Sequence, residues 1–424
     1  GGYDLIAFLF FIFFICLLIE IPVSIAIGLT SLTVRITQDI SLIVLPQRMF
    51  AGCDSFPFVA VPFFILAGDL LSQGKMSEKL VQFADSILGF FKGGLWLVAV
   101  LASAFFAAIS GSSAATTAAV GTPLIPELKK KGYDSAKSAA LIASGGCIGV
   151  IIPPSIPLVL YAVLADQSVA SLFLNGFFPG ILMAVSLSSI AIYTAHKNNY
   201  PKGSEFEIKN IWKCFKEAIW GIIMPLIILG GIFSGYFTPT EAAVIAVDYA
   251  LLVSVFIYKD MKLKDIFRVI TNSAITMSTI MFIIATSATL GWIMANWQIP
   301  SQIATALLSL SDNKYVLLFL ITIVVLIAGV FMETASALVL LTPVFLPLVT
   351  QLGINLVHFG IILIFGFAIG MITPPVAICL YVASTVSNIS IEKISKEVLP
   401  YLIALIIVLL LYAYLPLVFP FLII

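Results

Sequence analysis

The chain carries the segment Gly-x-Ile-x-Pro-Pro twice, each time inside a long apolar run. The first copy is Gly149–Pro154 and the second is Gly370–Pro375, and each residue of the second copy lies 221 positions after its counterpart in the first. Proline has no N–H and ends helical hydrogen bonding, so each copy predicts a break in an apolar helix. Irregular backbone at membrane depth is tolerated only where it is buried in protein or lines a cavity. The pair therefore predicts two matching interrupted helices around one site.

A small polar cluster precedes each copy by about the same distance. Ser110-Gly111-Ser112-Ser113 and Met332-Glu333-Thr334 each divide a longer apolar stretch into two runs. These runs are short for independent membrane spans, which need about 20 residues. We therefore expect two re-entrant hairpins, each followed by a discontinuous helix. The hairpins are expected at about 94–128 and 314–350, and the broken helices at about 135–166 and 355–388.

The composition places the chain in a membrane. Of its 424 residues, 61% are hydrophobic and only 10% are charged, whereas soluble domains have about a quarter charged residues. We expect an all-α polytopic membrane protein. Basic and acidic residues balance at 21 each, without the basic stripe of a nucleic-acid-binding protein. Two histidines, and five scattered cysteines without a Cys-x-x-Cys pair, favour neither metal nor nucleophile chemistry, so we do not expect an enzyme.

Lysine placement predicts the orientation of the two halves. The clusters Lys129–Lys131, Lys197–Lys216 and Lys259–Lys264 are separated by even numbers of expected crossings and therefore share a side. The positive-inside rule makes this side cytoplasmic. The second half then starts after an odd number of crossings, so residues 1–205 and 206–424 are expected to be inverted repeats. Lys197–Lys216 is expected to be a polar linker between them.

Five groups of short motifs, spread over nearly the whole chain, resemble those of one transporter family. They are Asp54–Pro57, Ser110–Ala114, Pro153–Ser155, Gly231–Gly235 with Phe237–Ala242, and Thr373–Pro375. Together they resemble the large membrane subunit of a tripartite ATP-independent periplasmic (TRAP) transporter, the DctM-like family. The combination is specific, although each motif alone is weak.

The resemblance implies a sodium-driven secondary transporter of the bacterial inner membrane that uses no ATP. It implies an elevator mechanism, in which residues 94–166 and 314–388 move against the remaining spans. The implied partners are a small four-helix membrane subunit and a periplasmic binding protein. The implied cargo is an organic acid anion such as a C4-dicarboxylate, sialic acid or a related sugar acid. The alternative is a self-sufficient sodium–dicarboxylate or citrate symporter that needs no binding protein.

The repeated segments also predict sites for two sodium ions. Sodium prefers oxygen ligands, and hydroxyls together with carbonyls freed at a helix break supply them without a buried charge. The alternative is that small and hydroxyl residues only allow the helices to pack closely. The first ion is expected at Ser110, Ser113 and Thr116 with the carbonyls of Gly149, Ile152 and Pro154. The second ion is expected at Glu333 and Thr334 with the carbonyls of Gly370, Thr373 and Pro375.

An anionic substrate is expected between the two hairpin tips. Helix N-termini there direct free N–H groups and partial positive charge at a carboxylate. Arginine is absent from both tips and both breaks, so a direct arginine clamp is not expected there. The expected lining residues are Ser112, Ser144, Gly145, Gly146 and Thr334.

Two acidic residues lie in apolar runs outside these clusters. Asp248, in the middle of Val244–Val253, is either a functional acid such as a proton site or a carboxylate that is paired or faces the small subunit. Asp69 stands nearer the end of its run, close to Lys75, and is expected at the membrane interface.

Overall fold

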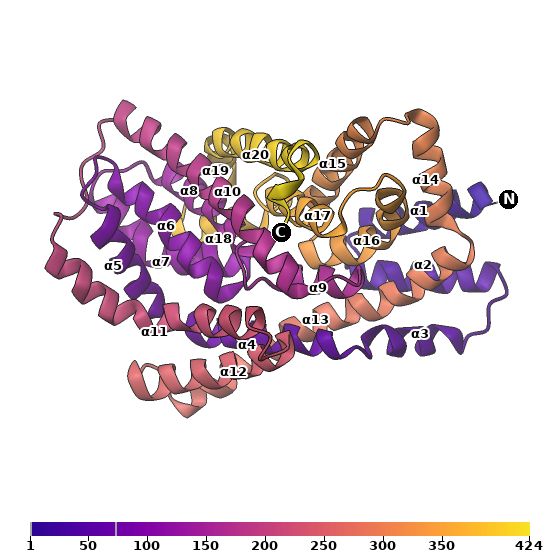
Figure 1. Cartoon of the computed structure of the whole chain (residues 1–424), viewed down its shortest axis with the longest axis horizontal. Coiled ribbons are helices and arrows are strands. Elements are labelled where there is room, and N and C mark those ends of the chain that lie inside the picture. The colour runs from indigo at the N-terminus through magenta and orange to yellow at the C-terminus, as the bar shows by residue number, and fades with distance from the viewer. Residues whose placement is uncertain (1, 73) are drawn as a thin grey trace.

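The computed structural model describes residues 2–72 and 74–424, which form twenty α-helices (Figure 1). By length and composition, seven of these helices are able to cross a membrane, or eight if one pair bent by 66° is counted as a single span. Apolar side chains cover much of the outer surface as well as the core. The chain is therefore an all-helical, multi-span membrane protein, as its composition predicts.

The first half of the chain contains ten α-helices. The bent pair is α3 and α4, which are joined through a short 3-10 turn at Phe56–Val59. The helices are α1 (Gly2–Leu18), α2 (Val23–Thr37), α3 (Val44–Cys53), α4 (Ala60–Ser72), α5 (Met76–Leu88), α6 (Gly94–Ser110), α7 (Ser113–Lys130), α8 (Ser135–Gly146), α9 (Ile156–Leu164) and α10 (Val169–Lys197).

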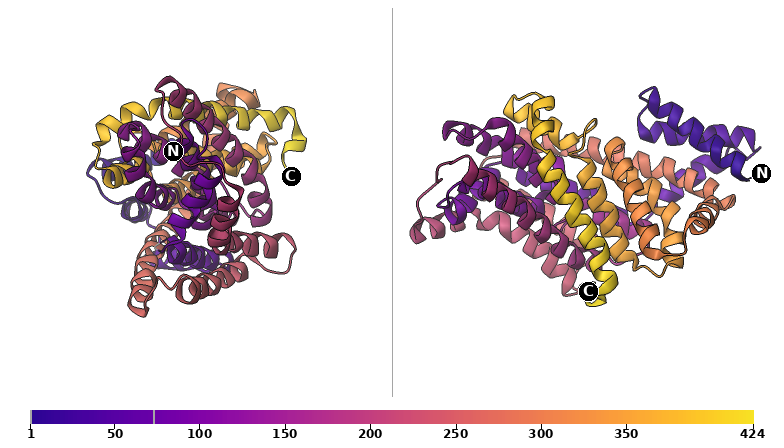
Figure 2. Two further views of the ribbon diagram at one scale, coloured as in Figure 1. Left: turned by 90° about the vertical axis from the view of Figure 1, so that its left-hand side faces the viewer. Right: turned by 90° about the horizontal axis from the view of Figure 1, so that it is seen from above.

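The second half contains the other ten. Figure 2 shows that helices from both halves intermingle along the long axis of the molecule. The helices are α11 (Ile208–Phe233), α12 (Pro239–Leu252), α13 (Leu263–Asn296), α14 (Ile299–Leu310), α15 (Lys314–Phe331), α16 (Thr334–Gln351), α17 (Leu356–Gly370), α18 (Ile378–Ser387), α19 (Ile391–Glu397) and α20 (Leu399–Val418).

The linker between the halves is shorter than its polar sequence predicts. Residues 198–207 connect α10 to α11, so the second part of the expected linker at Lys197–Lys216 is helical. Apolar residues recur there at helical spacing, and Phe215 packs against Phe83 of α5 with their ring centroids 5.6 Å apart. This contact holds the start of α11 in a helix that composition alone does not predict.

Two helical hairpins and two broken helices form the centre of the molecule. One hairpin consists of α6 and α7, and the other of α15 and α16. Between α8 and α9, a 3-10 turn at Cys147–Val150 is followed by irregular chain at residues 151–155, and the chain between α17 and α18 is irregular at residues 371–377. Both Pro-Pro peptide bonds, Pro153-Pro154 and Pro374-Pro375, are cis and lie in these breaks. The proline segments therefore interrupt helices where the sequence predicts.

Each broken helix starts beside its own hairpin and finishes beside the other one. Before its break, α8 packs against α7, and afterwards α9 packs against α16. In the same way α17 packs against α15, and α18 then packs against α7 and α8. Near the crossing point, the Cys147 thiol donates to the Ala368 carbonyl at 3.1 Å, and these residues are 221 positions apart. Residues at matching repeat positions thus meet where the two halves interlock.

Candidate functional site

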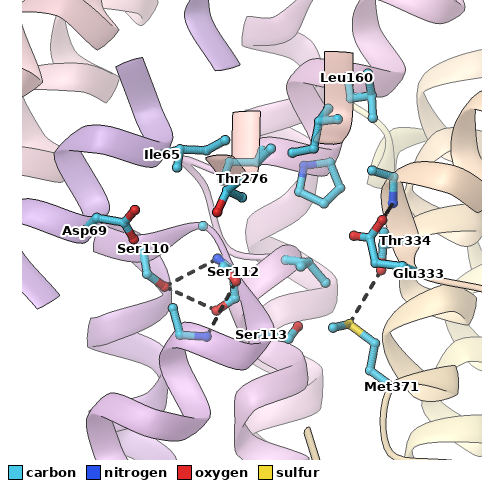
Figure 3. A pocket seen from close by; sticks show the side chains of 17 residues that line it. Ile65, Asp69, Ser110, Ser112, Ser113, Leu160, Thr276, Glu333, Thr334 and Met371 are labelled. Carbon is cyan, nitrogen blue, oxygen red and sulfur yellow. Dashed lines mark hydrogen bonds between the residues drawn. The ribbon is translucent and has the colours of Figure 1, made fainter. Parts of the chain in front are cut away.

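A cavity of about 230 Å³ lies between the tips of the two hairpins (Figure 3). In this view Asp69 and Ser110 lie on one side of the cavity, and Glu333, Thr334 and Met371 lie on the other. Helices α4 and α13 contribute Asp69 and Thr276 to its wall. The polar lining is therefore drawn from four separate parts of the chain.

The tip of the first hairpin is a compact group of hydroxyls. The Ser110 and Thr116 hydroxyl oxygens are 2.9 Å apart, and the Thr116 hydroxyl donates to the Ser112 carbonyl at 2.8 Å. The Ser112 hydroxyl caps α7 by accepting from the Ala115 N–H at 3.5 Å. This local capping explains why α7 begins directly after the turn.

Ser113 differs from its neighbours at this tip. Its side chain is 0% exposed and lines the cavity. Its hydroxyl oxygen has no hydrogen-bond partner within the described part of the chain. A buried polar atom without a partner is unfavourable, so an oxygen held in this way is suited to a ligand that the cavity admits.

The first break packs directly against this tip. A Cβ atom on Gly149 would lie 2.6 Å from the Ser112 carbonyl oxygen and 2.7 Å from the Thr116 hydroxyl, so only glycine permits the approach. The Pro154 carbonyl lies beside Gly111 of the turn. Ile152 packs instead against Gly180 of α10. The structure therefore brings Ser110, Thr116, Gly149 and Pro154 together, and it directs the Ile152 side chain toward α10.

The tip of the second hairpin carries a carboxyl group. The Glu333 carboxylate caps α16 by accepting from the N–H groups of Ala335 and Ser336 at 3.1 and 3.4 Å. The buried Thr334 hydroxyl donates to the sulfur of Met371 at 3.5 Å. Both Glu333 and Thr334 line the cavity.

The second break is placed differently from the first. Gly370 packs against the backbone of Gly329 in α15. The Thr373 hydroxyl donates to the Ile369 carbonyl, near the end of α17, at 2.8 Å. Pro375 is exposed. The structure thus gathers Glu333 and Thr334 at the cavity but leaves Gly370, Thr373 and Pro375 outside its lining.

Ser144, Gly145 and Gly146 also lie outside the lining of this cavity. The Ser144 hydroxyl donates to the Ala140 carbonyl at 2.8 Å within α8. Gly145 packs against Ser103 of α6, and Gly146 packs against Thr117 of α7. The two glycines allow α8 to pack closely on the hairpin. Among the five residues expected to line a substrate site, the structure brings Ser112 and Thr334 to the cavity.

Three helix N-termini converge on the cavity. The first residues of α7, α9 and α16 line it through Ser113, Ile156 and Thr334. The Ser155 hydroxyl caps α9 by accepting from the Leu158 N–H at 3.4 Å. Helix N-termini carry partial positive charge, so this convergence favours an anionic group in the cavity.

Asp69, which the sequence predicts only to lie near the membrane interface, also belongs to this site. It is half-buried in α4 and lines the cavity, where its carboxylate accepts from the Ser273 hydroxyl of α13 at 2.6 Å. Thr276, one helical turn further along α13, also lines the cavity. An acidic residue within an apolar helix is the sequence feature that identifies such a position.

The charges around the cavity are unbalanced. Asp69 and Glu333 supply two carboxyl groups, and the residues that line the cavity include no lysine, arginine or histidine. An anion that enters between two carboxylates is repelled unless cations enter with it or a carboxyl group is neutral. The lining set is Ile65, Asp69, Ser110, Gly111, Ser112, Ser113, Ala115, Val150, Ile156, Pro157, Leu160, Thr276, Ile280, Glu333, Thr334, Ala335 and Met371.

Comparison with known families identifies the chain. Residues 10–418 match the family described as "Tripartite ATP-independent periplasmic transporter, DctM component". The chain belongs to this family. It is thus a TRAP transporter permease and not an enzyme, as the motifs predict.

Individual relatives extend the comparison. The chain is 38% identical over 416 residues to the "Isethionate TRAP transporter permease protein DctMQ" of Oleidesulfovibrio alaskensis, a match that covers 97% of this chain and 65% of the relative. It therefore spans slightly less than two thirds of that protein. It is 35% identical over 415 residues to the "C4-dicarboxylate TRAP transporter large permease protein DctM" of Rhodobacter capsulatus, with 94% of both chains covered.

A solved structure shares the fold. The YdaH transporter of Alcanivorax borkumensis, whose crystal structure is described as having an unusual topology, superposes with a TM-score of 0.57. The match covers 88% of each chain at 15% sequence identity. At this level of identity the likeness concerns the fold of the TRAP permease alone.

Proposed function

We propose that this TRAP permease imports a small organic acid anion together with sodium ions through an elevator mechanism. The observation that carries the proposal is Ser113, which lines the cavity beside three helix N-termini and whose buried hydroxyl is unpaired among the described residues. An unsatisfied oxygen ligand and a positive helix terminus at one place suit a cation and an anion that bind together.

The proposed first sodium site contains Ser110, Ser113 and Thr116 with the carbonyls of Gly149, Ile152 and Pro154. Its support is the contact of Gly149 with the hairpin tip and the hydroxyl cluster around Ser110. The carboxylates of Asp69 and Glu333 give sodium a further role, because bound cations offset their repulsion of an anion.

The proposed second sodium site contains Glu333 and Thr334 with the carbonyls of Gly370, Thr373 and Pro375. Only the first two residues line the cavity in this structure. The second break reaches this turn through the contact of Met371 with Thr334, and assembly of the site would bring its remaining residues closer to Glu333. The substrate anion is proposed to lie between the two sites, in contact with Ser112 and Thr334.

In the elevator mechanism, residues 94–166 and 314–388 move as one unit. The packing supports this movement as one unit, because α9 packs on α16 of the second hairpin and α18 packs on α7 of the first. The hairpins and the broken helices are therefore interlocked. Residues 1–205 and 206–424 are proposed to be inverted repeats, and the contact between Cys147 and Ala368 at matching positions supports a pseudo-twofold relation. The α4 and α13 part of the cavity wall would belong to the stationary unit.

Contacts among the lysine-rich segments support the proposed orientation. Lys131 donates to the Gly203 carbonyl at 3.2 Å, and Ser204 donates to the Asp85 carbonyl of α5 at 3.1 Å. On the same helix, Lys79 forms an ion pair with Glu217 at 2.6 Å, and Tyr258 donates to the Glu217 carbonyl. These contacts connect all three lysine clusters at one end of the bundle, which we assign to the cytoplasmic side of a bacterial inner membrane.

The proposed partners are a small four-helix membrane subunit and a periplasmic binding protein, as the tripartite family description implies. The cargo is proposed to be a C4-dicarboxylate, a sialic or related sugar acid, or a sulfonate. The relatives' printed names include both isethionate and C4-dicarboxylate, so family membership leaves the choice open. Energy would come from the sodium gradient and not from ATP.

Reconstitution tests the proposal. The chain, its small membrane subunit and its binding protein are placed in liposomes, and uptake of a panel of labelled organic acids is measured with and without an inward sodium gradient. We expect uptake of one class of acid that requires both sodium and the binding protein. Uptake by the chain alone would instead support a self-sufficient sodium–dicarboxylate or citrate symporter. Uptake that is independent of sodium would contradict the coupling.

A further inference from the structure

Asp248 lies at the centre of a membrane-spanning helix. Helix α12 and the π-helical turn that follows it form a 19-residue apolar span, Pro239–Ile257, and Asp248 has nine residues on either side of it. At a rise of about 1.5 Å per residue, its Cα is about 13 Å from both ends of the span. This places the carboxylate close to the middle of a hydrocarbon layer about 30 Å thick.

The Asp248 side chain points away from the protein. Helix α12 lies at the lower edge of the molecule in Figure 1, where it packs on α4 and α11. Its buried face consists of small residues such as Ala243, Ala246 and Ala250. Asp248 and Leu252 are exposed on the opposite face. The ion pairs between residues of the described chain all lie elsewhere, and none of its hydrogen bonds reaches the Asp248 carboxylate.

A second acidic residue on the same face of α12, Glu241, differs from Asp248 because it has hydrogen-bond partners within the chain. Glu241 stands at the beginning of α12, where its carboxylate accepts from the Thr238 N–H and hydroxyl at 2.8 and 2.9 Å. This capping box explains Glu241 within the chain itself. Asp248 is seven residues further along, beyond the reach of such a cap. Its side chain is also too short to extend to the headgroups as lysine and arginine do. A carboxylate in this position requires a polar partner from another molecule.

We propose that the outer face of α12 is the docking surface for the small membrane subunit, which places a basic side chain against Asp248. The inference rests on the proposed function, since it assumes the tripartite assembly. Charge complementarity supports a basic partner. The isethionate relative, which is matched over only 65% of its length, shows that a permease of this family can carry a substantial further portion of chain.

A second copy of this chain is a poorer occupant of the same face. In a twofold dimer the same surface of both copies meets, so an interface through α12 would bring the two Asp248 carboxylates near one another. Like charges at membrane depth oppose such an interface. Lipid tails are also a poorer occupant, because they offer no hydrogen bond to the Asp248 carboxylate.

Photo-crosslinking tests the surface directly. A benzoylphenylalanine is placed at Leu252, which is 55% exposed on the Asp248 face, or at the control position Ile403, which is 51% exposed on α20. The full chain is co-expressed with the tagged small membrane subunit of its own system. We expect an adduct with the small subunit from position 252 and none from position 403. Adducts with lipid alone, or with a second copy of this chain, would overturn the proposal.

Substitution of the carboxylate provides the second test. Asp248→Leu is expected to lower co-elution of the small subunit with the chain at least 10-fold, and Asp248→Lys to lower it further because two cations would meet. Asp248→Leu should leave the thermal midpoint of the chain in detergent unchanged or raised, which excludes misfolding as the cause. Undiminished co-elution of both variants would contradict the inference.

These measurements do not depend on transport. Suppose that the wild-type complex forms, that Asp248→Leu releases the small subunit, and that the wild-type complex takes up no organic acid. The docking surface is then confirmed and the proposed function is wrong. Suppose instead that the reconstituted wild-type system transports an acid with sodium, and that the Asp248→Leu and Asp248→Lys variants both retain the small subunit. The proposed function is then confirmed and the proposed docking surface is wrong.

Discussion

The two hairpin tips occupy matching positions in the sequence repeat but have different chemistry. The first tip is neutral, because Ser112 caps α7 with a hydroxyl. The second tip is acidic, because Glu333 caps α16 with a carboxylate. The breaks beneath them also differ, since Pro153 and Pro154 are buried whereas Pro374 and Pro375 are exposed. The repeat thus preserves the backbone plan while the side chains and their burial diverge.

This difference indicates separate tasks for the two halves of the site. At the first tip, the break already touches the hydroxyl cluster through Gly149, so an ion site there is largely assembled. At the second tip, the break reaches Thr334 through the Met371 side chain, while Gly370 contacts Gly329 and the Thr373 and Pro375 residues lie outside the cavity lining. We infer that the first site binds an ion without large rearrangement and that the second is completed when cargo enters. Four substitutions test this comparison.

Gly149→Ala is expected to have the largest effect. The added methyl group would meet the Ser112 carbonyl and the Thr116 hydroxyl and separate the break from the hairpin tip. Because overpacking costs about 1–3 kcal/mol, we expect the sodium concentration for half-maximal uptake to rise up to about 100-fold. This concentration is measured from the sodium dependence of uptake in liposomes. Gly121→Ala in α7 is the matched control, because its methyl group would make only ordinary contacts at 3.4 Å or more. Equal behaviour of both variants would contradict a preassembled first site.

Glu333→Gln is expected to have the next largest effect. Glutamine retains the capping oxygen of α16 but removes the charge at the second tip. An interaction with a charged group contributes about 1.5–3 kcal/mol, so we expect sodium activation to weaken about 20-fold. Glu392→Gln, at an exposed position in α19, is the control. Should sodium activation of Glu333→Gln match the wild type, Glu333 is not an ion ligand.

Ser113→Ala separates ion binding from stability. Its hydroxyl has no partner among the described residues, so its removal should leave the thermal midpoint in sodium-free buffer unchanged or slightly raised. A neutral ligand contributes about 1 kcal/mol, so the sodium concentration that gives half-maximal stabilisation should rise about 5-fold. Ser103→Ala provides the comparison, because the Ser103 hydroxyl is satisfied by the Ala99 carbonyl at 2.7 Å. An unchanged sodium response in Ser113→Ala argues against the first ion site.

Thr334→Val is expected to have the smallest effect. The Thr334 hydroxyl already donates to Met371, whose thioether is a weak acceptor, and the second site is incomplete in this structure. We expect about a 2-fold weakening of sodium activation, corresponding to a few tenths of a kcal/mol. Thr322→Val, at a buried threonine of α15 that bonds to the Leu318 carbonyl, is the control. A larger effect for Thr334→Val than for Ser113→Ala would reverse the proposed difference between the tips.

The sequence predicted the elements of the fold more fully than their contacts. Prolines and small polar residues act locally, so the breaks at residues 147–155 and 371–377 follow from the Gly-x-Ile-x-Pro-Pro segments. Helical periodicity and apolar composition likewise predict an all-helical membrane protein. The prediction of a linker up to Lys216 was wrong at the start of α11, because packing of Phe215 on Phe83 stabilises a helix in this polar segment.

The site was only partly predictable. The polar clusters identified Ser110, Ser112, Ser113, Glu333 and Thr334, all of which line the cavity. The place of Asp69 in the cavity was not predictable, because it depends on the packing of α4 on α13, where Asp69 bonds to Ser273, 204 positions away. Ser144, Gly145 and Gly146 were expected at the substrate, yet the Ser144 hydroxyl is bonded within α8 and the two glycines face the neighbouring helices α6 and α7. Spacing along a helix predicts a shared face but not what lies opposite that face.

The sequence by itself determined the repeated plan of two hairpins and two interrupted helices, because proline, glycine and hydroxyl residues impose their geometry on adjacent backbone. Only the tertiary structure decided that α9 crosses to the second hairpin, that Asp69 joins the cavity and that Pro153 and Pro154 are buried while Pro374 and Pro375 are exposed. The physical reason is the distance along the chain over which each kind of interaction acts. Backbone preferences act over a few residues, whereas burial and convergence depend on packing between segments hundreds of residues apart.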